Sequence, residues 1–378
     1  MPESRPLSYV EVDLAAIAAN TRTVRGLLGP DVALIAVVKA NAYGHGLVPC
    51  AQTMLQHGAD WLAVSRVNEA LALRAAGITA PVLTLGYAAP DEAEAAVRYG
   101  ITLAVGDRPT VLALSRAAVA LGRPAAVHLK VDTGMSRFGL LPEEVVPFLC
   151  WLADQPGVRA TGIFSHFATA DNADKSFVHV QFAEFQRVLA AVEAAGFDLP
   201  LRHIANSSAI FDLPATLLDG ARPGIVLYGL YPSADVRHDV PLRPALAIKS
   251  RVGRVRRIPA GASVGYDRTF IAPRPMTVAL IPVGYGDGYP RLLSGEGEVL
   301  IRGRRARLVG RVCMDQCVVD VSHIPGVAQE DEVVLLGRQG EESITAEDLA
   351  RMARTINYEI VTSLLPRLPR VWLPVREA

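Results

Sequence analysis

The chain has 378 residues, of which 51 % are hydrophobic, and this is enough for a packed core and more than one domain. Its 38 Lys and Arg residues equal its 38 Asp and Glu residues in number, so the formal net charge is zero. Nucleic-acid-binding proteins usually carry a basic excess, so the composition gives that class no support. Local basic runs at 251–257 and 302–307 alternate along expected strands, and we interpret them as solvated strand faces.

Cysteine spacing and hydropathy bear on the cellular setting. The four cysteines have no CxxC spacing and no histidine cluster beside them, so we expect neither a metal site nor a disulfide framework. The first residues lack a basic start followed by an apolar stretch, and no apolar run reaches membrane-spanning length. The sequence therefore predicts a cytoplasmic protein with no secretory signal and no membrane partner.

From about residue 30 to about residue 230, short Val/Ile/Leu-rich runs alternate with Ala-rich segments of helical periodicity. The expected strands are 32–39, 61–65, 81–86, 101–105, 125–132, 159–166, 201–206 and 221–228. The expected helices between them include 68–76, 109–121, 143–154 and 177–195. About eight βα units in about 200 residues favour a (β/α)₈ barrel of the TIM type over the competing doubly wound open sheet.

One expected strand, at 9–13, is surplus to a full barrel, and we infer that it pairs with the C-terminal region. After about residue 235 the pattern changes to short strand-like runs separated by Gly and Pro turns, with 245–258 as the first of them. One helix is expected at 346–354, where Thr345 is a cap with Asp348 three residues on. The sequence therefore predicts an α/β barrel over 10–235 and a mainly β C-terminal domain over 236–378, joined by the first strand near 1–13.

Barrels of this type carry their chemistry at the C-terminal ends of the strands, and candidate residues converge there. Lys39, His166 and Asn206 with Ser207 end the first, sixth and seventh expected strands; Lys130, Asp132 and Arg137 lie at or just beyond the fifth; and Arg222, Gly224 and Ile225 follow the start of the eighth. Each has an ordinary structural explanation when taken alone, as a surface lysine, a hydrogen-bonded histidine or turn residues. Their convergence on one rim favours a functional site.

The residue types on this rim suit a phosphorylated aldehyde. The loops after the last two barrel strands commonly bind phosphate, and here they read IANSS and RPGI, with small residues and a hydroxyl. A lysine on the first strand can form a Schiff base with an aldehyde, and pyridoxal phosphate is such an aldehyde. Arg222, on the last strand, can face the pyridine nitrogen.

The segment AVVKANAYGHG at residues 36–46 resembles the pyridoxal-phosphate lysine motif of alanine racemases. The likeness continues in family order through KVDTGMSRFG, FSHFATAD, ANSSAI, ARPGIVLYG, VGYDRTF, IPVGYGDGYPR, GRVCMDQ and INYEI, and so covers both expected domains. The resemblance implies an eight-stranded barrel with a C-terminal β domain. It also implies the interconversion of L-alanine and D-alanine with pyridoxal 5'-phosphate, and a supply of D-alanine for peptidoglycan.

The resemblance also implies roles for individual residues. Lys39 would hold the cofactor as an internal aldimine and act as one base, and Tyr266 would act as the other in a two-base proton transfer. The residues implied to bind the cofactor are Tyr43, His166, Asn206, Ser207, Arg222, Gly224, Ile225 and Tyr358, with Arg222 on the pyridine nitrogen and His166 linking Arg222 to the tyrosine. The remaining roles fall to Arg137 and Met314 (substrate carboxylate), Lys130 (carbamylated in some members, positioning Arg137), and Tyr285 and Asp315 (entrance).

Two consequences follow from these implied roles. Lys and Tyr side chains both titrate near pKa 10, so the site must lower at least one of these pKa values. Arginine does not readily protonate the pyridine nitrogen, so we expect a short-lived quinonoid and few side reactions.

In the family the tyrosine comes from the second subunit of a homodimer, which would make each active site composite. Gly265 and Asp267 depart from the family pattern, and we expect the Asp267 carboxylate to point to solvent.

Three rival functions fit the sequence less well. An amino-acid decarboxylase of the same barrel type would carry a glycine-rich phosphate loop and a cysteine–aspartate motif, which Cys313-Met314-Asp315 does not match. A broader-specificity or serine racemase is the nearest alternative, although Tyr285 and Tyr358 as bulky site residues favour a small substrate side chain. A non-catalytic pyridoxal-phosphate carrier would lack the second domain.

Overall fold

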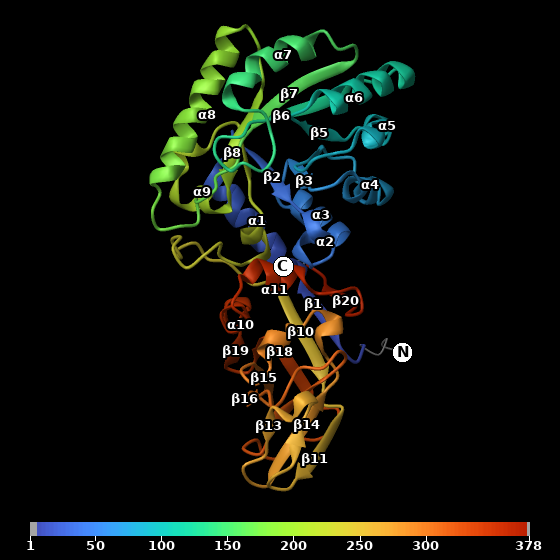
Figure 1. Ribbon diagram of the computed structural model, residues 1–378, viewed down its shortest axis with the longest axis vertical. Helices are drawn as coiled ribbons and strands as arrows, with labels where there is room; N and C mark the ends of the chain where they lie inside the picture. Colours follow the sequence, from blue (N-terminus) through green and yellow to red (C-terminus); the bar gives the residue numbers. More distant parts are fainter. Residues whose placement is uncertain (1–5, 376–378) are drawn as a thin grey trace. The chain divides into compact units, whose positions relative to one another are not determined.

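The computed structural model describes residues 6–375, and Figure 1 shows its elements. The chain forms two compact units. The barrel unit comprises Ala16–Ala42 and Leu47–Pro244, and the β unit comprises the described parts of Met1–Ala15, Tyr43–Gly46 and Ala245–Ala378. Within residues 6–375, no helix has both the length and the apolar composition needed to cross a membrane.

The barrel unit contains a closed barrel of parallel strands, as the sequence predicted. The strands are β2 (Ala33–Val37), β3 (Trp61–Val64), β4 (Val82–Thr84), β5 (Thr102–Val105), β6 (Ala125–Lys130), β7 (Val158–Phe164), β8 (Leu201–Asn206) and β9 (Gly220–Arg222). Most of their residues are buried, because helices cover the outside of such a barrel and side chains fill its inside. Their runs of Val, Ile, Leu and Ala are therefore nearly continuous rather than alternating.

Helices follow the strands in sequence, and those from α4 to α8 are visible beside the strands in Figure 1. They are α1 (Leu14–Leu28), α2 (Lys39–Tyr43), α3 (Leu47–Gln56), α4 (Val67–Ala75), α5 (Ala93–Arg98), α6 (Arg108–Leu121), α7 (Val145–Ala153), α8 (Ser176–Ala194) and α9 (Ser207–Asp212). Local sequence sets their ends. In α6, the Asp107 side chain accepts a hydrogen bond from the Thr110 N–H, and Gly122 closes the helix at φ 61°.

Most of the expected barrel strands were too long at their C-terminal ends: 61–65 by one residue, 32–39, 81–86, 125–132 and 159–166 by two, and 221–228 by six. β2 ends at Val37, so Lys39 lies in the turn after the strand rather than on it. The expected strand 221–228 stops at Arg222, and a 3₁₀-helix, η4 (Ile225–Tyr228), follows. Pro223 has no N–H for a strand ladder, and Gly224 turns the chain at φ −123° and ψ −91°.

The β unit contains three sheets. The largest has the order β16-β15-β18-β10-β1-β20, with β19 paired to β18; the others are β11-β14-β17 and β12-β13. Its strands are β1 (Tyr9–Asp13), β10 (Leu246–Arg251), β11 (Arg254–Ile258), β12 (Ser263–Val264), β13 (Phe270–Ile271), β14 (Met276–Ile281), β15 (Glu298–Ile301), β16 (Arg304–Arg307), β17 (Cys317–Asp320), β18 (Glu332–Gln339), β19 (Glu342–Ile344) and β20 (Arg370–Leu373). Its helices are α10 (Ala346–Ala353) and α11 (Asn357–Thr362).

Strand β1 pairs antiparallel with β10 and parallel with β20, so the first strand of the chain lies in the large sheet of the β unit. The expected single strand 245–258 is instead two strands in two sheets, because the chain leaves β10 at Val252-Gly253 before β11 begins. The expected helix cap is present, since the Thr345 hydroxyl accepts a hydrogen bond from the Asp348 N–H.

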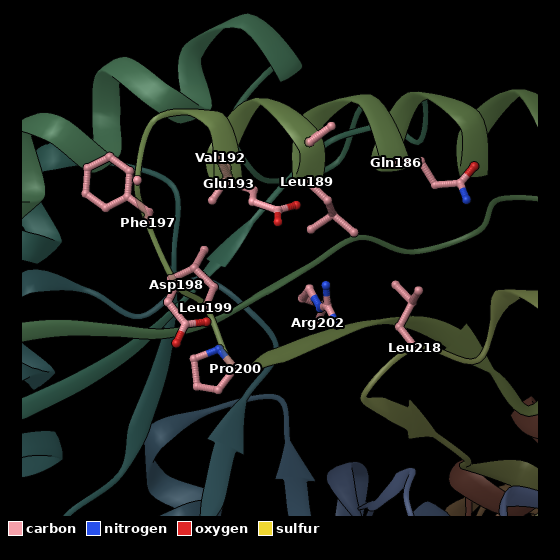
Figure 2. A pocket seen from close by; sticks show the side chains of 12 residues that line it. Gln186, Leu189, Val192, Glu193, Phe197, Asp198, Leu199, Pro200, Arg202 and Leu218 are labelled. Carbon is pink, nitrogen blue, oxygen red and sulfur yellow. The ribbon is translucent and has the colours of Figure 1, made fainter.

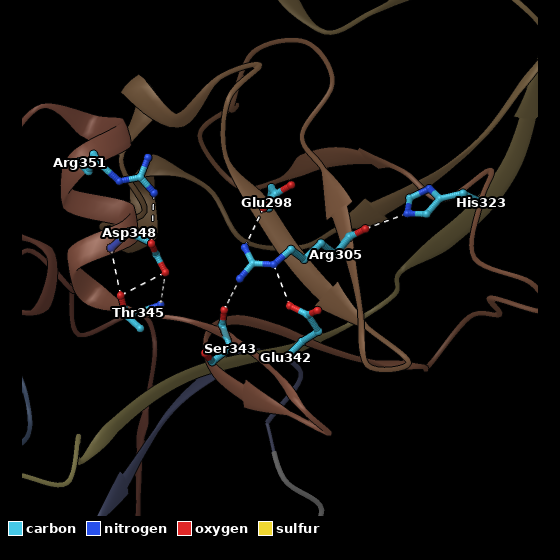
Figure 3. A network of polar contacts seen from close by, with 8 residues as sticks. All are labelled: Glu298, Arg305, His323, Glu342, Ser343, Thr345, Asp348 and Arg351. Atoms are coloured by element: carbon cyan, nitrogen blue, oxygen red, sulfur yellow. Dashed lines mark hydrogen bonds and ion pairs between the residues drawn. The ribbon is translucent and has the colours of Figure 1, made fainter.

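The arginine-rich strand β16 is held within its own sheet (Figure 3). Arg305 donates to Glu298 and Glu342 at 2.8 Å each and to the Ser343 carbonyl, and the Arg305 carbonyl lies 2.8 Å from His323 Nε2. Arg305 is therefore a structural link between β15, β16 and β19, while Arg304 and Arg307 are exposed as the sequence predicted.

Candidate active site

Lys39 begins a turn of left-handed backbone. The next four residues, Ala40, Asn41, Ala42 and Tyr43, all have positive φ between 51° and 55°. Left-handed conformation costs non-glycine residues about 1–2 kcal/mol each, so the surrounding structure must hold this turn. Glu69 of α4 does so in part: its Oε1 accepts the Ala40 N–H at 2.6 Å, while its Oε2 accepts the Ser65 and Arg66 N–H groups.

The electrostatic setting of Lys39 favours its neutral amine. Burial lowers the pKa of Lys39 from its ordinary value, and the nearby guanidinium of Arg137 and, less strongly, that of Arg222 lower it further. The Glu69 carboxylate acts in the opposite direction but does not reverse the shift in the Lys39 pKa. A lysine in this state can act as a nucleophile or as a base nearer to neutral pH than an exposed lysine can.

Arg222, the last residue of β9, is the centre of the buried rim. It is 4 % exposed, and burial lowers its pKa to about 9. Its two terminal nitrogens donate to the Ser165 carbonyl at 2.7 Å, to the His203 and Ile204 carbonyls at 3.1 Å, and to imidazole nitrogens of His203 and His166. Its Nε–H takes part in none of these bonds.

His166 lies just beyond β7, next to Arg222. An Arg222 terminal nitrogen lies 3.2 Å from His166 Nδ1, and because a guanidinium only donates, Nδ1 is the acceptor and the ring proton lies on Nε2. Burial and then the Arg222 charge hold the pKa of His166 well below its usual value. His166 is therefore a neutral donor at Nε2 and accepts a hydrogen bond from Arg222 at Nδ1, while its expected connection to the tyrosine stays a prediction.

The loop after β6 is folded around Asp132. Its carboxylate accepts the N–H groups of the next turn, from Gly134 to Arg137, at 2.9–3.1 Å. Burial opposes ionisation, but these N–H groups hold the pKa of Asp132 below its usual value. The loop leaves Arg137 exposed, with its charge close enough to lower the pKa of Lys39.

Lys130, the last residue of β6, is buried and points its charge at the same rim. Its Nζ donates to the Val131 carbonyl at 2.6 Å and lies 5.6 Å from the centre of the Phe164 ring. Burial and then the Arg222 charge lower the pKa of Lys130 to about 7. A neutral, nucleophilic amine is thus accessible to Lys130 at ordinary pH.

The loops after β8 and β9 form a small polar cradle. Asn206 caps α9 by accepting the Ala209 N–H at 3.0 Å, which is a structural role. The Ser207 hydroxyl accepts the Gly224 N–H at 2.9 Å, so its own proton is free to be donated. In the described residues the N–H of Ile225, at the start of η4, donates no hydrogen bond to another part of the chain.

The remaining expected site residues lie in the β unit. Tyr266 (68 % exposed) and Met314 (52 % exposed) line one surface cavity of about 360 Å³ with Gly265, Cys313, Asp315 and Gln316. The Tyr285 N–H donates to the Cys313 carbonyl at 3.0 Å, and Asp315 pairs with Arg367 at 2.8 Å.

Two further features of the β unit complete the set. The Asp267 carboxylate is mainly exposed and pairs with Arg311 at 2.8 Å, in agreement with the expectation that it does not turn inward. The rings of Tyr43 and Tyr358 lie 6.1 Å apart.

A cavity of about 710 Å³ lies at the end of the barrel where the strands begin, opposite the end that carries Lys130 and Asn206 (Figure 2). It is lined by the C-terminal half of α8 and by Arg202, near the start of β8, whereas Asn206 and the cradle lie at the end of β8. Arg202 is already bound to both oxygens of Asp219. Its charge is thus compensated within the fold, and barrels place their chemistry at the other end.

Sequence reasoning missed three side chains: Glu69 beside the turn after Lys39, and His128 and His203 inside the barrel. Glu69 supports the turn after Lys39, and its signal was an acidic residue in the first turn of the helix after β3. The two histidines lie inside the barrel and connect to Arg222, and their only signal was a polar residue within an apolar strand.

Comparisons with known proteins show the family and the fold. The family model for the alanine racemase N-terminal domain matches residues 12–232, and that for the C-terminal domain matches residues 245–372. An alanine racemase of Desulforamulus reducens is 46 % identical over 370 residues, covering 97 % of this chain and 98 % of the relative. The solved alanine racemase of Clostridium difficile 630 has a TM-score of 0.94 at 36 % identity, covering 98 % of this chain and 97 % of that one. A histidine racemase from Leuconostoc mesenteroides has a TM-score of 0.88 at 31 % identity, with 99 % of both chains covered. Two matching domain models and near-complete coverage at these identities show that the chain belongs to the alanine racemase family.

Proposed function

We propose that this chain interconverts L-alanine and D-alanine with pyridoxal 5'-phosphate bound at the barrel rim. One observation carries the proposal. Lys39, whose pKa is lowered, follows the first barrel strand, and the buried Arg222 ends the last one. The names of the relatives support alanine as the substrate.

The side chains present fit this cofactor by donor and acceptor type. A pyridine nitrogen accepts hydrogen bonds, and the Arg222 Nε–H is a donor that makes no hydrogen bond within the described residues. A phosphate accepts hydrogen bonds, and the cradle offers the Ser207 hydroxyl and the Ile225 N–H. When bound, the cofactor supplies an aldehyde that condenses with amines and a ring that makes an α-proton more acidic.

Within the barrel unit we assign the phosphate to Ser207 and Ile225. Gly224 takes a supporting role in this proposal, because its N–H is already donated to Ser207 and thereby fixes the hydroxyl. Asn206 likewise acts through the α9 cap. Tyr43 and Tyr358 are the other residues to which we assign the phosphate.

Lys39 and Tyr266 act as the two bases in this proposal. Racemisation removes a proton from one face of the α-carbon and returns a proton to the other face, so one base on each face is the most direct arrangement. The lowered pKa of Lys39 raises the share of neutral amine near neutral pH. Tyr266 offers an exposed hydroxyl, as a residue that acts outside its own unit requires.

The substrate carboxylate is assigned to Arg137 and to the backbone of Met314. Arg137 is exposed on a loop fixed by Asp132, and its guanidinium makes no ion pair within residues 6–375. Lys130 supports Arg137, and its pKa of about 7 permits carbamylation, because carbon dioxide reacts with neutral amines. Tyr285 and Asp315 form the entrance.

We propose a homodimer in which Tyr266 of one subunit completes the site of the other. The large exposed fraction of Tyr266 supports this, since an aromatic side chain 68 % open to water has surface left for a partner. Mixing Lys39→Ala and Tyr266→Phe subunits should restore about one quarter of wild-type activity, because half of the dimers would be mixed and each would hold one intact site. Activity in a strictly monomeric species would contradict the composite site. The D-alanine formed would serve peptidoglycan synthesis.

Borohydride trapping tests the cofactor assignment directly. The sequence contains only four lysines, at 39, 130, 175 and 249, so peptide mapping after reduction has few possible outcomes. We expect pyridoxyl label on Lys39 and loss of alanine interconversion in Lys39→Ala. Lys175→Ala, which removes an ion pair with Asp212, is the matched control and should keep both label and activity. Label on another lysine would refute the assignment of Lys39.

Chiral chromatography with alanine, serine and histidine as separate substrates tests the substrate assignment. We expect the largest kcat/KM for alanine. Faster turnover of serine or histidine than of alanine would refute it, even if Lys39 carries the label.

A further inference from the structure

Two histidines meet inside the barrel across an intervening strand. His128 of β6 and His203 of β8 are both fully buried, and His128 Nδ1 lies 3.0 Å from His203 Nε2. The strand between them is β7, whose Gly162 is the register partner of His128. A Cβ atom at Gly162 would lie 2.7 Å from His128 Nε2 and 2.7 Å from the Leu201 carbonyl. The missing side chain at Gly162 therefore leaves the space in which the two rings meet.

Arg222 fixes the direction of the hydrogen bonds that connect it to His203 and His203 to His128. An Arg222 terminal nitrogen lies 2.5 Å from His203 Nδ1, and a guanidinium can only donate. His203 Nδ1 must therefore lack a proton, so that the His203 proton lies on Nε2 and is donated to His128 Nδ1. The His128 proton then lies on its own Nε2, which has no hydrogen-bond partner. A second proton on either ring would place two donors face to face.

The surroundings keep both rings neutral. Burial and then the Arg222 charge hold the pKa of His203 well below its usual value, and the same two causes lower the pKa of His128 to about 3. The charged groups acting on the pair are cations, Arg222 from β9 and Lys130 from β6. The other contacts are aromatic: Phe164 stacks on His203 at 4.9 Å, and the Trp61 ring lies 5.7 Å from His128.

We propose that His128 is a positioning residue for Arg222: by accepting the His203 Nε2–H, it holds His203 as a fixed acceptor that orients the guanidinium toward the cofactor ring. This inference rests on the proposed function, because it takes Arg222 as the partner of the pyridine nitrogen. The contacts run from Arg222 through His203 and end at His128. Removing the acceptor at position 128 leaves a buried His203 N–H unsatisfied, so the ring turns and Arg222 loses its shortest contact.

A pair of substitutions separates this role from simple packing. His128→Phe keeps a ring but removes the acceptor, whereas in His128→Asn the side-chain oxygen can take the place of Nδ1. His179→Phe, on an exposed position of α8, is the matched control. We expect His128→Phe to lower kcat about tenfold with KM changed less than about twofold, the size of one lost buried hydrogen bond. His128→Asn should recover kcat to within about threefold of wild type, and the absorption band of the bound cofactor should shift only in His128→Phe.

Nitrogen NMR of the imidazole and guanidinium groups gives a readout that needs neither cofactor nor turnover. In the cofactor-free protein we expect an unprotonated Nδ1 and a protonated Nε2 on both His128 and His203, unchanged between about pH 5 and 9. The Arg222 side-chain signals should move in His128→Phe and stay in place in His179→Phe.

The outcomes distinguish this inference from the proposed function. A protonated Nδ1 on His203, or a titrating His128, would overturn the inference even if the protein racemises alanine. So would a His128→Phe protein with wild-type Arg222 signals, cofactor band and kcat. If His128→Phe does not fold, the wild-type tautomers and the His128→Asn kinetics decide the question. Failure of the wild type to bind cofactor would refute the proposed function, while the tautomers would still test the connection to Arg222.

Discussion

Arg222 is 4 % exposed and donates five hydrogen bonds inside the barrel unit, whereas Tyr266 is 68 % exposed on a short turn of the β unit. The barrel residues are held by one another, since Glu69 supports the turn after Lys39 and Asp132 supports the loop to Arg137. The Tyr266 side chain is held much less. The contrast separates a rigid, preorganised group of residues in the barrel unit from an exposed side chain of the β unit, which under the proposed function completes a site only on assembly.

The largest effect on activity should come from the exposed residue, Tyr266. Tyr266→Phe should lower alanine interconversion about 10²–10⁴-fold, because under the proposed function it removes one of the two proton-transfer groups. Its melting temperature should match that of wild type, since the hydroxyl lies on a mostly exposed side chain. Kinetics and thermal unfolding of the same samples give both numbers. Tyr99→Phe, at a residue 49 % exposed in the barrel unit, is the control, and a large loss of stability in Tyr266→Phe would break the contrast.

The buried side should behave in the opposite way. Arg222→Lys keeps the charge but cannot reach all the acceptors around it, so we expect the free energy of unfolding to fall by about 3 kcal/mol along with activity. Denaturant unfolding of the cofactor-free protein measures this. Arg256→Lys, on an exposed strand position, should change the unfolding free energy by less than about 0.5 kcal/mol. Equal stability of the two variants would show that Arg222 is not structurally anchored.

A smaller effect is expected one contact away from Lys39. In Glu69→Gln one carboxylate oxygen becomes an amide nitrogen, so the side chain cannot accept hydrogen bonds from both Ala40 and Ser65. We expect a loss of about 1–2 kcal/mol in unfolding free energy and a lower pKa of Lys39, because the Glu69 charge raises that pKa. Glu94→Gln, in an exposed ion pair of α5, is the control. An unchanged pH–rate profile would sharpen the contrast by confining Glu69 to a structural role.

The last effect is measured per pH unit, as the slope of folding stability against pH. The folded pKa of Lys130 is about 7, below its unfolded value, so between pH 7 and about 10.5 the unfolded state binds more protons. Folding stability should therefore rise with pH across this window, by at most about 1.4 kcal/mol per pH unit from this group. Lys130→Met should flatten the rise, as measured by urea unfolding of the cofactor-free protein in carbonate-free buffer. Lys175→Met, at a lysine paired with Asp212, should leave the slope unchanged.

Much of the barrel was predictable because its physics is local. Alternating apolar runs and Ala-rich helical segments recur along the chain, and the ends of β6 and β8 place Lys130 and Asn206 at the rim as expected. The turn after Lys39 was not predictable, because KANAY contains Ala and Asn where a sequence normally signals left-handed backbone with Gly. That conformation depends on Glu69, which lies 29 residues away from Ala40 in the sequence.

The β unit was less predictable for a related reason. The run 245–258 is apolar and basic throughout, and only the pairing partners decide that its two halves belong to different sheets. The exposure of Tyr266 was likewise invisible in VGYDRTF, since a tyrosine in that setting fits a core equally well. Contacts between distant residues carry this information, and a single sequence does not display them.

The absence of a side chain at Gly162 makes room for the His128 ring. A chain with any side chain at position 162 would need a smaller residue than histidine at position 128, because the two would occupy the same volume. The same Cβ atom would also lie 2.7 Å from the Leu201 carbonyl, so a Gly162→Ala change should be destabilising even beside a smaller residue 128. Gly162 has no positive φ that calls for glycine, so the residue is required there by its neighbours, the His128 ring among them.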